Sequence, residues 1–386
     1  MKRKQNDIVI VLGHDHTNSL GIVQTLGDLG YYMVAFVWGQ KTGLLKYSRY
    51  LKELYGASDV QSCINLMIEK FGNSVNKIPI IPCCDNAALT IEQNKERLEK
   101  TFLYEYSKQY SLKYLAKKEN QVRLATEANL FVPKTWNLRD KDNIPNDIIF
   151  PCLIKPLISS QGAKSDIRIC KDINELHENL STLKYTKEVL IQQYIERDYE
   201  ISILGCGLKN GDVIIPCVEN KLTLYPKNVG LECLAYIQKL EEQTIISGIK
   251  NLIESIGYVG VFSVEMMHCK LDGKLYFTEI NLRNDGANSF IVKYGVNLPA
   301  IHIDDLFDNE IVLPNKFNPG FYLWEMHHYQ SWRHHDITFK EWFGDIIKSK
   351  GFLTTYKNDY KPFLGQFKSI GRMLLHLPNE DIEYYS

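Results

Sequence analysis

The sequence predicts two architectures in one chain, a parallel α/β unit followed by an α+β region built on antiparallel strands. The opening residues alternate buried strand, helix and buried strand, which is typical of a parallel sheet. From about residue 148 the strands come in pairs joined by short polar turns, which indicates antiparallel hairpins. The length of 386 residues exceeds the size at which one core stops growing, so we expect two or three domains.

The parallel unit is expected to cover residues 1–110. The turn Gly13-His14-Asp15-His16 follows its first strand, at the edge where open α/β sheets place ligands. This turn is not a G-x-G-x-x-G fingerprint, so a dinucleotide site is only weakly indicated. After the last strand, Asp85-Asn86 is expected to cap a helix. The expected elements are strands at Asp7–Leu12, Met33–Trp38 and Ile78–Pro82 and a helix at Asn18–Leu29.

The second region is expected to cover 111–315, with a C-terminal helical extension over 316–386 that packs on the body. It opens with a helix over Lys113–Asn129, and a second helix is expected over about Glu232–Ile256. Lys209-Asn210-Gly211-Asp212 is a strong hairpin turn. The expected strands are Ile149–Lys155, Ser165–Ile169, Val189–Ile195, Tyr199–Leu208 and Val213–Val218.

The segment Gly260–Arg283 is the most informative part of the chain and is predicted to be a hairpin. A three-residue loop at Leu271-Asp272-Gly273, with Gly273 in the left-handed conformation, would pair Lys270 with Lys274. Counting outward from that loop places Glu265 opposite Glu279. Asn281 and Arg283 follow Glu279 at intervals of two, so they lie on the same face.

Two facing carboxylates repel each other unless a cation lies between them. With the amide oxygen of Asn281 beside Glu265 and Glu279, the expected occupant is a hard cation such as Mg2+, together with a nucleotide phosphate. The alternative is a solvated hairpin face whose charges pair with nearby lysines.

Two earlier segments carry weaker signals. In Phe150–Arg168 a strand delivers Lys155, and a loop of small residues with Lys164 follows, where backbone N–H groups can approach an anion. In Val189–Ser202 the backbone of Gln193-Tyr194-Ile195 can offer hydrogen bonds to an adenine edge, and Glu200 can hold ribose hydroxyls. A solvated lysine loop and an ordinary hairpin are the respective alternatives.

The composition is that of an ordinary globular protein, with 45% hydrophobic and 24% charged residues. The net charge of -1 and the absence of a long basic run argue against nucleic acid as a partner. No segment is long enough to span a bilayer, and the apolar run Ile8–Leu12 is too short for a signal peptide. Nine cysteines without a C-x-x-C pair indicate reduced thiols, so a cytoplasmic location is expected.

The order of these segments resembles the ATP-grasp superfamily. The resemblance covers roughly residues 1–310, and its most specific elements are Glu279-Ile280-Asn281-Leu282-Arg283, with Glu265 upstream, and then Lys155-Pro156. Other phrases resemble its carboxylate–amine ligases, which include D-aspartate-ligase-like and carbamoyl-phosphate-synthase-like members. These phrases are Leu12-Gly13, Ser48-Arg49-Tyr50, Pro133-Lys134-Thr135 and Tyr294-Gly295-Val296-Asn297-Leu298-Pro299.

The resemblance implies a pre-ATP-grasp domain at 1–110 and a nucleotide site between two subdomains, a lid at about 120–195 and a metal-binding part at about 196–315. Lys118 and Lys155 would neutralise the α- and β-phosphates. The Ser159–Lys164 loop, with Ser160 and Lys164 on the nucleotide, would close as a lid and keep water out. The adenine slot would be lined by Gln193, Tyr194 and Ile195, and Glu200 would bind the ribose.

The resemblance also implies that Glu265, Glu279 and Asn281 hold one or two Mg2+ ions, with Mn2+ as a possible substitute. Arg283, catalytic together with Lys155, would steady the transferred phosphoryl group. The substrate would lie in the cleft near His14, Asp15 and Arg283. Three departures stand out: Lys117 occupies a position where an Asp is common, Gln192-Gln193 replaces acidic and basic residues, and the loop has one glycine.

The expected function is ATP-dependent ligation of a carboxylate to an amine through an acylphosphate, because a carboxylate does not condense with an amine in water. A kinase or carboxylase on the same site, or a nucleotide-binding protein without turnover, are the alternatives. The substrates would be small molecules, with an amino acid, a peptide or an amino sugar as the amine. A homodimer is expected from the family's habit only.

Overall fold

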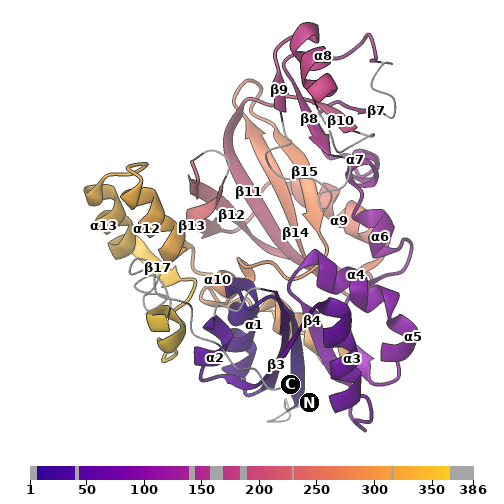
Figure 1. Cartoon of the computed structure of the whole chain (residues 1–386), viewed down its shortest axis with the longest axis vertical. Coiled ribbons are helices and arrows are strands. Elements are labelled where there is room, and N and C mark those ends of the chain that lie inside the picture. The colour runs from indigo at the N-terminus through magenta and orange to yellow at the C-terminus, as the bar shows by residue number, and fades with distance from the viewer. Residues whose placement is uncertain are drawn as a thin grey trace.

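The computed structural model describes residues 7–39, 43–138, 144–156, 168–182, 189–227, 230–313 and 317–365. Three sheets organise these residues, and Figure 1 shows them in tiers, with the N-terminal sheet at the bottom, a small sheet at the top and a large one between. None of the helices in the described residues combines the length and apolar character needed to cross a membrane.

The N-terminal sheet is parallel throughout, with strand order β3-β2-β1-β4-β5, which confirms the predicted α/β architecture. The buried runs at the centre of the sheet pack against helices on both faces, with α1 on one and α3 on the other. The strands are β1 (Ile8–Gly13), β2 (Tyr32–Trp38), β3 (Leu51–Ala57), β4 (Ile78–Pro82) and β5 (Phe102–Leu103). The helices are α1 (Thr17–Gly27), α2 (Leu44–Tyr47), α3 (Val60–Phe71), α4 (Asp85–Gln93) and α5 (Lys95–Leu98).

The segment after the N-terminal sheet joins the tiers. Strand β6 (Tyr106–Ser107) pairs with the large sheet, and two helices follow, α6 (Leu112–Leu115) and α7 (Lys118–Glu127). A single helix was expected over Lys113–Asn129, but it is interrupted because Lys117 has an extended backbone (φ -79°, ψ 124°) and precedes α7 as its N-cap. This break places Lys118 at the first position of a helix.

The small sheet is antiparallel, with strand order β7-β10-β8-β9, and is covered by α8 (Ile173–Thr182). Leu176 and Leu180 of α8 pack on the buried side chains of Cys152 and Ile154. The strands are β7 (Thr135–Leu138), β8 (Cys152–Pro156), β9 (Arg168–Cys170) and β10 (Val189–Gln193).

The large sheet runs in the order β15-β14-β11-β12-β13-β16-β17, with β6 beside β14. Apolar residues alternate between its faces: Ile203 packs in the core that holds α9 (Gln243–Ile256), while Leu204 packs in the core that holds α10 (Asn288–Val292) and α11 (Leu298–Leu306). The strands are β11 (Arg197–Gly207), β12 (Val213–Tyr225), β13 (Leu231–Gln238), β14 (Tyr258–Cys269), β15 (Leu275–Asn281), β16 (Gly320–Leu323) and β17 (Ser349–Phe352).

The helix expected over Glu232–Ile256 is wrong at its start. Residues Leu231–Gln238 form β13, which hydrogen-bonds to β12 on one side and β16 on the other, and only Gln243–Ile256 is helical. Strand pairing on both edges therefore overrides the helix propensity of the leucine, glutamate and alanine in this segment. Strand β12 is also longer than expected and continues from Val218 to Tyr225.

The C-terminal segment is not purely helical, as had been expected. It contains α12 (Glu325–Arg333) and α13 (Phe339–Lys348), but β16 and β17 add two strands to the edge of the large sheet. Figure 1 shows this segment beside β13, on the opposite side of the large sheet from β15. The C-terminal segment therefore contacts the rest of the protein through backbone hydrogen bonds as well as through side-chain packing.

All nine cysteines lie within the described residues, and each is a free thiol, as expected. Eight of them are buried, and Cys84 is partly exposed. Burial raises the pKa of the neighbouring Cys83 and Cys84 thiols, which disfavours the reactive thiolate. The structure therefore supports a packing role for this pair.

Candidate active site

Glu265 and Glu279 lie directly opposite each other on β14 and β15, as the sequence predicted. The route to this register differs from the expected one. Cys269 rather than Lys270 pairs with Lys274, and a bulge at Thr278 then restores the register between Met266 and Glu265. Gly273 does adopt the left-handed conformation, with φ +69°.

The bulge has a specific anchor. The Thr278 hydroxyl donates a 2.8 Å hydrogen bond to the Glu265 carbonyl, which fixes the extra residue at the point where the two carboxylates face each other. A bulge re-aims the side chains around it. The predicted loop was one residue too short, and the bulge adds one residue to β15. The two differences cancel, so Glu265 still pairs with Glu279.

The Glu265 carboxylate is held from two sides. Ser202 of β11 donates a 2.8 Å hydrogen bond to Oε1, and the Lys221 ammonium of β12 lies 2.5 Å from Oε2. Burial raises the pKa of Glu265, while the positive charge of Lys221 opposes that rise. A cation thus already sits beside one of the two expected metal-binding carboxylates.

Glu279 faces the start of α7. Its Oε2 lies 3.5 Å from the Lys118 ammonium at the start of α7, and 39% of its side chain is exposed. Lys155, on β8 of the small sheet, donates a 2.7 Å hydrogen bond to Gln192 Oε1. Burial and the nearby charge of Lys118 lower the pKa of Lys155 to about 8, although Glu279 opposes this. The two lysines thus lie close enough to repel each other in the absence of a bound anion.

Asn281 and Arg283 continue the same face of the hairpin. The Asn281 side-chain amide donates to Ser263 Oγ at 3.4 Å. The Arg283 guanidinium forms ion pairs with Asp85 at 3.1 Å and with Asp285 at 3.3 Å. Asp85 does not cap α4, as had been expected, because Cys84 is the N-cap residue. It instead links the N-terminal domain to Arg283.

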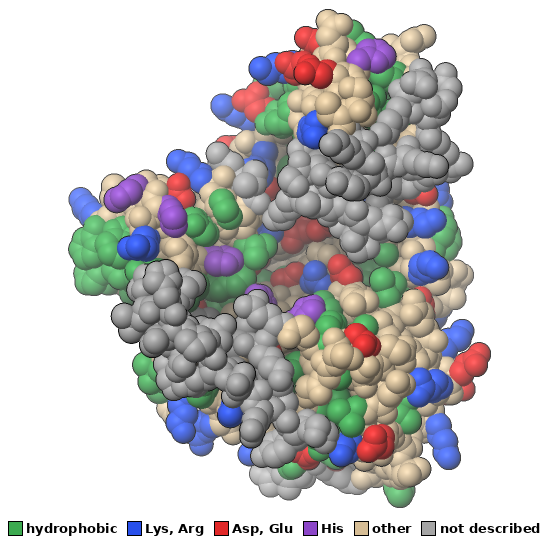
Figure 2. Space-filling view, viewed as in Figure 1, with side chains coloured by type: hydrophobic (Ala, Val, Ile, Leu, Met, Phe, Trp, Pro, Cys, Tyr) green, Lys and Arg blue, Asp and Glu red, His purple; other side chains and the backbone are tan. Residues whose placement is uncertain are grey.

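These side chains line one cavity of about 880 Å3 between the three sheets. Figure 2 shows a hollow in the middle of the molecule with acidic and basic side chains on its floor. Of the residues predicted for the site, the cavity brings together His14, Asp15, Lys118, Lys155, Glu200, Glu265, Glu279, Asn281 and Arg283.

The expected adenine segment does not line this cavity. The Gln193 N–H donates to the Lys134 carbonyl at 2.8 Å and the Tyr194 N–H donates to the Pro151 carbonyl at 3.0 Å, so both groups already have partners. Ile195 is buried. Tyr194–Glu196 instead connects the small sheet to the large one, between the end of β10 and the start of β11. Glu200 lines the cavity, paired with Arg197.

Asp15 and His14, two of the predicted substrate residues, follow the first strand of the N-terminal sheet and have different contacts. Both carboxylate oxygens of Asp15 accept backbone N–H groups, from Gly43 at 2.6 Å and from Leu45 at 3.0 Å, so Asp15 holds the start of α2. The His14 ring lies against Trp38, and its Nδ1 is 3.2 Å from the Trp38 carbonyl. His14 remains the better candidate for a substrate contact.

A side-chain amide pair joins the N-terminal domain to the segment after Arg283. Asn18 Nδ2, in the first turn of α1, donates to the Cys83 carbonyl at 2.9 Å and to the Asn284 carbonyl at 3.0 Å. Asn284 Nδ2 donates in return to Asn18 Oδ1. These bonds fix the hairpin's end against the carboxyl edge of the parallel sheet.

The predicted lid residues Ser160 and Lys164 lie outside the described residues.

Several cavity residues were not predicted, above all Lys221 and Glu219 on β12, Glu232 on β13 and Asp285. The alternation Glu219-x-Lys221-x-Thr223 is the sequence signal that could have identified them. The predicted strand stops at Val218, one residue before this alternation begins. Trp324 also lines the cavity, so the C-terminal segment contributes to the site.

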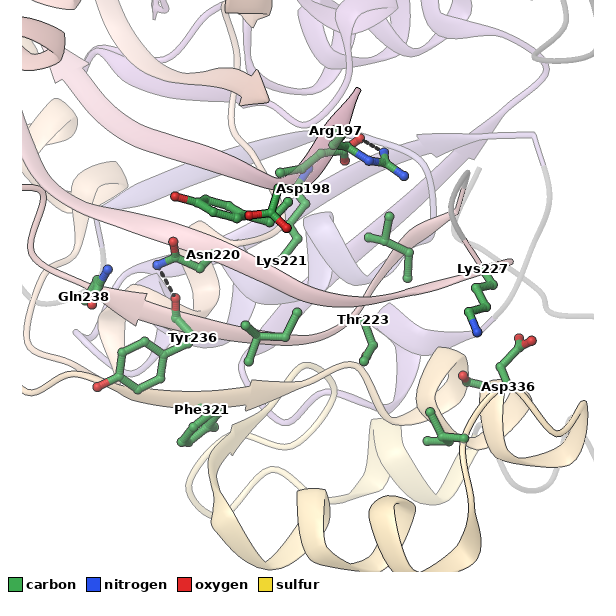
Figure 3. Close-up of a pocket in the computed structure, with 16 residues that line it drawn as sticks. Arg197, Asp198, Asn220, Lys221, Thr223, Lys227, Tyr236, Gln238, Phe321 and Asp336 are labelled. Carbon is green, nitrogen blue, oxygen red and sulfur yellow. Dashed lines mark hydrogen bonds and ion pairs between the residues drawn. The ribbon is translucent and has the colours of Figure 1, made fainter. Parts of the chain in front are cut away.

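A second hollow of about 700 Å3 adjoins the first along β11, β12 and β13. Arg197, Glu200 and Lys221 line both. Figure 3 shows Arg197 and Lys221 on their strands, with Tyr236 and Phe321 on the other side of the hollow and Asp336 at one end. The second hollow is therefore an extension of the site toward the C-terminal segment.

The described residues contain no cluster of three or more His, Cys, Asp or Glu side chains arranged to hold a metal. The expected set has two carboxylates and an amide, all oxygen donors, which suits Mg2+ when phosphate oxygens and water complete its shell. The Lys221 ammonium beside Glu265 shows that a cation is accommodated at this carboxylate.

The comparisons agree with this geometry. Residues 123–290 match the model of the ATP-grasp domain. A D-aspartate ligase of Enterococcus faecium (strain Aus0004) is 22% identical over 270 residues, covering 65% of this chain and 64% of that protein. Across eight curated relatives, the matched part spans between 40% and 64% of the relative's length.

Solved structures with the same fold cover more of the chain. An N5-carboxyaminoimidazole synthetase from Staphylococcus aureus superimposes with a TM-score of 0.64 at 15% identity and covers 83% of each chain. An L-amino acid ligase from Bacillus licheniformis gives a TM-score of 0.59 at 15% identity, covering 83% of this chain and 80% of that one. At these identities the likeness establishes the fold.

Proposed function

This chain contains an ATP-grasp domain, and on that premise we propose that it is a Mg2+- and ATP-dependent ligase that joins a carboxylate to an amine. The observation that carries the proposal is the distribution of charge across one cavity. Lys118 and Lys155 lie on the side of the small sheet, and Glu265, Glu279 and Asn281 lie on the large sheet. A magnesium–triphosphate complex has the complementary charges for both sides.

The lysine side would bind the nucleotide phosphates. The pKa of Lys155 is lowered to about 8 partly because Lys118 is its neighbour. A polyanion between the two ammonium groups would replace this repulsion with attraction, so binding would restore the charge of Lys155. Arg283, which forms ion pairs with Asp85 and Asp285, would stabilise charge on a transferred phosphoryl group.

The acidic side would hold the metal. Glu279 is partly exposed in the cavity, and its Oε2 forms an ion pair with the Lys118 ammonium at 3.5 Å. Bound there with Glu265 and Asn281, Mg2+ would neutralise phosphate charge and orient the γ-phosphate.

Phosphorylation solves the chemical difficulty of the reaction. A carboxylate oxygen is a very poor leaving group, whereas the phosphate of an acylphosphate leaves readily when an amine attacks. The protein's task is to position three reactants and to exclude water from the activated acid. A site of this kind has no need of a protein nucleophile.

The substrates belong to the proposal as a class. The names of two related proteins, a D-aspartate ligase and an L-amino acid ligase, point to an amino acid as the carboxylate donor. The acceptor would be the amine of an amino acid, a peptide or an amino sugar. His14 and Trp324 line the cavity where these substrates would approach the metal hairpin.

The test is ADP and phosphate release with Mg–ATP and a matrix of D- and L-amino acids, dipeptides and amino sugars, supplied singly and in pairs. The proposal predicts release that requires a carboxylate and an amine together, with a product whose mass is their sum less one water. Release with one substrate and a stable phosphorylated product would identify a kinase instead. Release that requires bicarbonate would identify a carboxylase.

A further inference from the structure

One row of polar residues crosses four strands of the large sheet. Glu279 on β15 is opposite Glu265 on β14, Glu265 is opposite Ser202 on β11, and Ser202 is opposite Glu219 on β12. Adjacent strands are about 4.8 Å apart, so Glu219 lies about 10 Å along the row from Glu265. The row places a third carboxylate on the floor of the cavity, two strands beyond the proposed metal ligands.

Glu219 is buried without a hydrogen-bond partner for one of its oxygens. The residue is 1% exposed, and its Oε1 has no hydrogen bond to any described group. Two neighbouring donors are directed elsewhere, because the Ser202 hydroxyl in the row and the Lys221 ammonium, two residues along β12, both bond to Glu265. A buried carboxylate oxygen without a partner carries a large desolvation cost, so the geometry calls for a donor from outside the protein.

Glu232 is a second carboxylate of the cavity, opposite Leu224 of β12 on the neighbouring strand. It lies on β13 and lines the same cavity as Glu219. Burial raises the pKa of both groups, and for Glu219 the next cause is the negative charge of Glu232. Lys221 is the nearby cation, but it is shared with Glu265. This end of the cavity therefore has more carboxyl groups than cations, and the raised pKa values reflect that imbalance.

Two kinds of ligand could supply the missing charge, a metal ion or an ammonium. A metal would need further oxygen, nitrogen or sulfur donors around it, and the Ser202 hydroxyl, which is opposite Glu219 in the row, is already bonded to Glu265. An ammonium needs only hydrogen-bond acceptors, and its three N–H donors suit two carboxylates. The chemistry of this pair therefore favours a protonated primary amine.

We propose that Glu219 and Glu232 form the binding site for the acceptor substrate's ammonium group and take its proton before it reacts. This inference rests on the proposed ligase function and assigns the acceptor to a class, primary aliphatic amines that are protonated at neutral pH. Weakly basic nitrogens, such as those of anilines and carboxamides, are excluded as natural acceptors. The pair is the general base of the coupling half of the reaction.

Coupling requires the acceptor nitrogen to lose two protons. One N–H proton of the ammonium passes to a carboxylate of the pair, which leaves a lone pair on nitrogen. That lone pair forms the C–N bond at the acyl carbon, and the C–O bond to phosphate breaks with its electrons leaving on the phosphate. A second N–H proton leaves with the phosphate, so the product is a neutral amide. Glu219 and Glu232 thus act only after the carboxylate has been activated.

The test separates the two half-reactions in Glu219→Gln, Glu232→Gln and the control Glu241→Gln, an exposed residue before α9. Hydroxylamine, which is largely unprotonated at neutral pH, traps acylphosphates without needing a base. With D-aspartate and the other amino acids as donors, all three variants are expected to form hydroxamate at the rate of the unaltered protein. Hydroxamate formation also shows that each variant is folded and binds Mg–ATP.

Coupling to a primary amine is the discriminating reaction. Both site variants are expected to lose coupling by about 100-fold or more at neutral pH, and to regain it as pH rises and the amine deprotonates in solution. Equal losses of hydroxamate and amide would overturn the inference, as would an unchanged coupling rate or a loss that high pH does not relieve. Failure of the unaltered protein to make any hydroxamate counts against the proposed function instead.

If the unaltered protein makes no hydroxamate, a binding measurement still tests the ammonium site. Propylammonium chloride, compared with sodium chloride at the same concentration, is expected to raise the Tm of the unaltered protein and of Glu241→Gln. The double variant Glu219→Gln/Glu232→Gln should show no such rise. The same rise in all three proteins, or in none, would exclude an ammonium site at this pair.

Discussion

The ammonium of Lys221 on β12 lies 2.5 Å from the carboxylate of Glu265 on β14, reaching across the intervening strand β11. Both side chains are largely buried, with 12% and 18% exposure. A buried ion pair of this kind is costly to break, because one charge is left without a partner. The pair also marks Glu265 as a position that the fold has built to stand beside a cation.

The first prediction concerns that ion pair. Lys221→Met should lower the free energy of unfolding by about 3–5 kcal/mol at neutral pH, because the buried Glu265 carboxylate loses its counter-charge. The loss should shrink as pH falls, since the pKa of Glu265 is raised and the carboxyl becomes neutral before an exposed one would. Urea unfolding at several pH values measures both effects.

Two variants control that experiment. Lys227→Met removes an exposed lysine near the end of β12 and should leave the free energy of unfolding nearly unchanged. Lys221→Met/Glu265→Gln removes both charges and should recover most of the lost stability. A double variant no more stable than Lys221→Met would show that the two groups are not coupled.

The second prediction concerns Lys155 and pH. Its pKa of about 8 without a ligand means that much of the group is neutral above that pH. Binding of Mg–ATP should raise this pKa, so nucleotide binding takes up a proton and weakens as pH rises past about 8. Calorimetric titration in two buffers of different ionisation enthalpy measures the proton uptake.

The variant Lys155→Met should abolish this proton uptake and weaken nucleotide binding. Lys134→Met is the matched control, because Lys134 lies nearby in sequence but forms an exposed ion pair with Asp147. Uptake that persists in Lys155→Met would assign the proton to another group.

The third prediction concerns Glu279. Replacing it with glutamine should reduce ADP release by roughly 100-fold or more, because the metal and the phosphoryl group lose a charged ligand. Its side chain is 39% exposed, so the fold should be unaffected and Tm should stay close to that of the unaltered protein. Glu254→Gln, on the exposed face of α9, provides the control. Full activity in Glu279→Gln would remove this residue from the metal site.

The fourth prediction concerns the joint between domains. Asn18→Ala removes hydrogen bonds to the carbonyls of Cys83 and Asn284 and leaves the buried Asn284 side chain without its acceptor. Each buried group left unpaired costs about 1–3 kcal/mol, so unfolding should become easier by at least that amount. Asn251→Ala, on the exposed face of α9, tests for a general effect of losing an asparagine. Equal denaturation midpoints for the two variants would contradict the role of this joint.

The sequence predicted the central hairpin because its pattern is local. Alternation of period two and the left-handed Gly273 were enough to place Glu265 opposite Glu279. The loop assignment was wrong by one residue, and the bulge at Thr278 compensated for it. A bulge of this kind has no clear signature in sequence, since its anchor is a hydrogen bond across the hairpin.

The parts of the site that sequence reasoning missed depend on long-range pairing. Leu231–Gln238 resembles a helix when taken alone and becomes β13 only between β12 and β16. Glu219, Lys221 and Glu232 were missed with it, because their shared face exists only once those strands pair. Asp15 has a contact that its place at a strand end did not indicate, since its carboxylate holds the start of α2 while the residue also lines the cavity.

In the proposed reaction the carboxylate is phosphorylated before the amine attacks, and an isotope experiment follows the carboxylate oxygen that this step transfers. The donor identified by the substrate matrix is prepared with 18O in its carboxylate, and the released phosphate is analysed by mass spectrometry. The released phosphate should carry one 18O atom for every amide formed, because the acyl C–O bond breaks. Phosphate without 18O, formed alongside the amide, would contradict it.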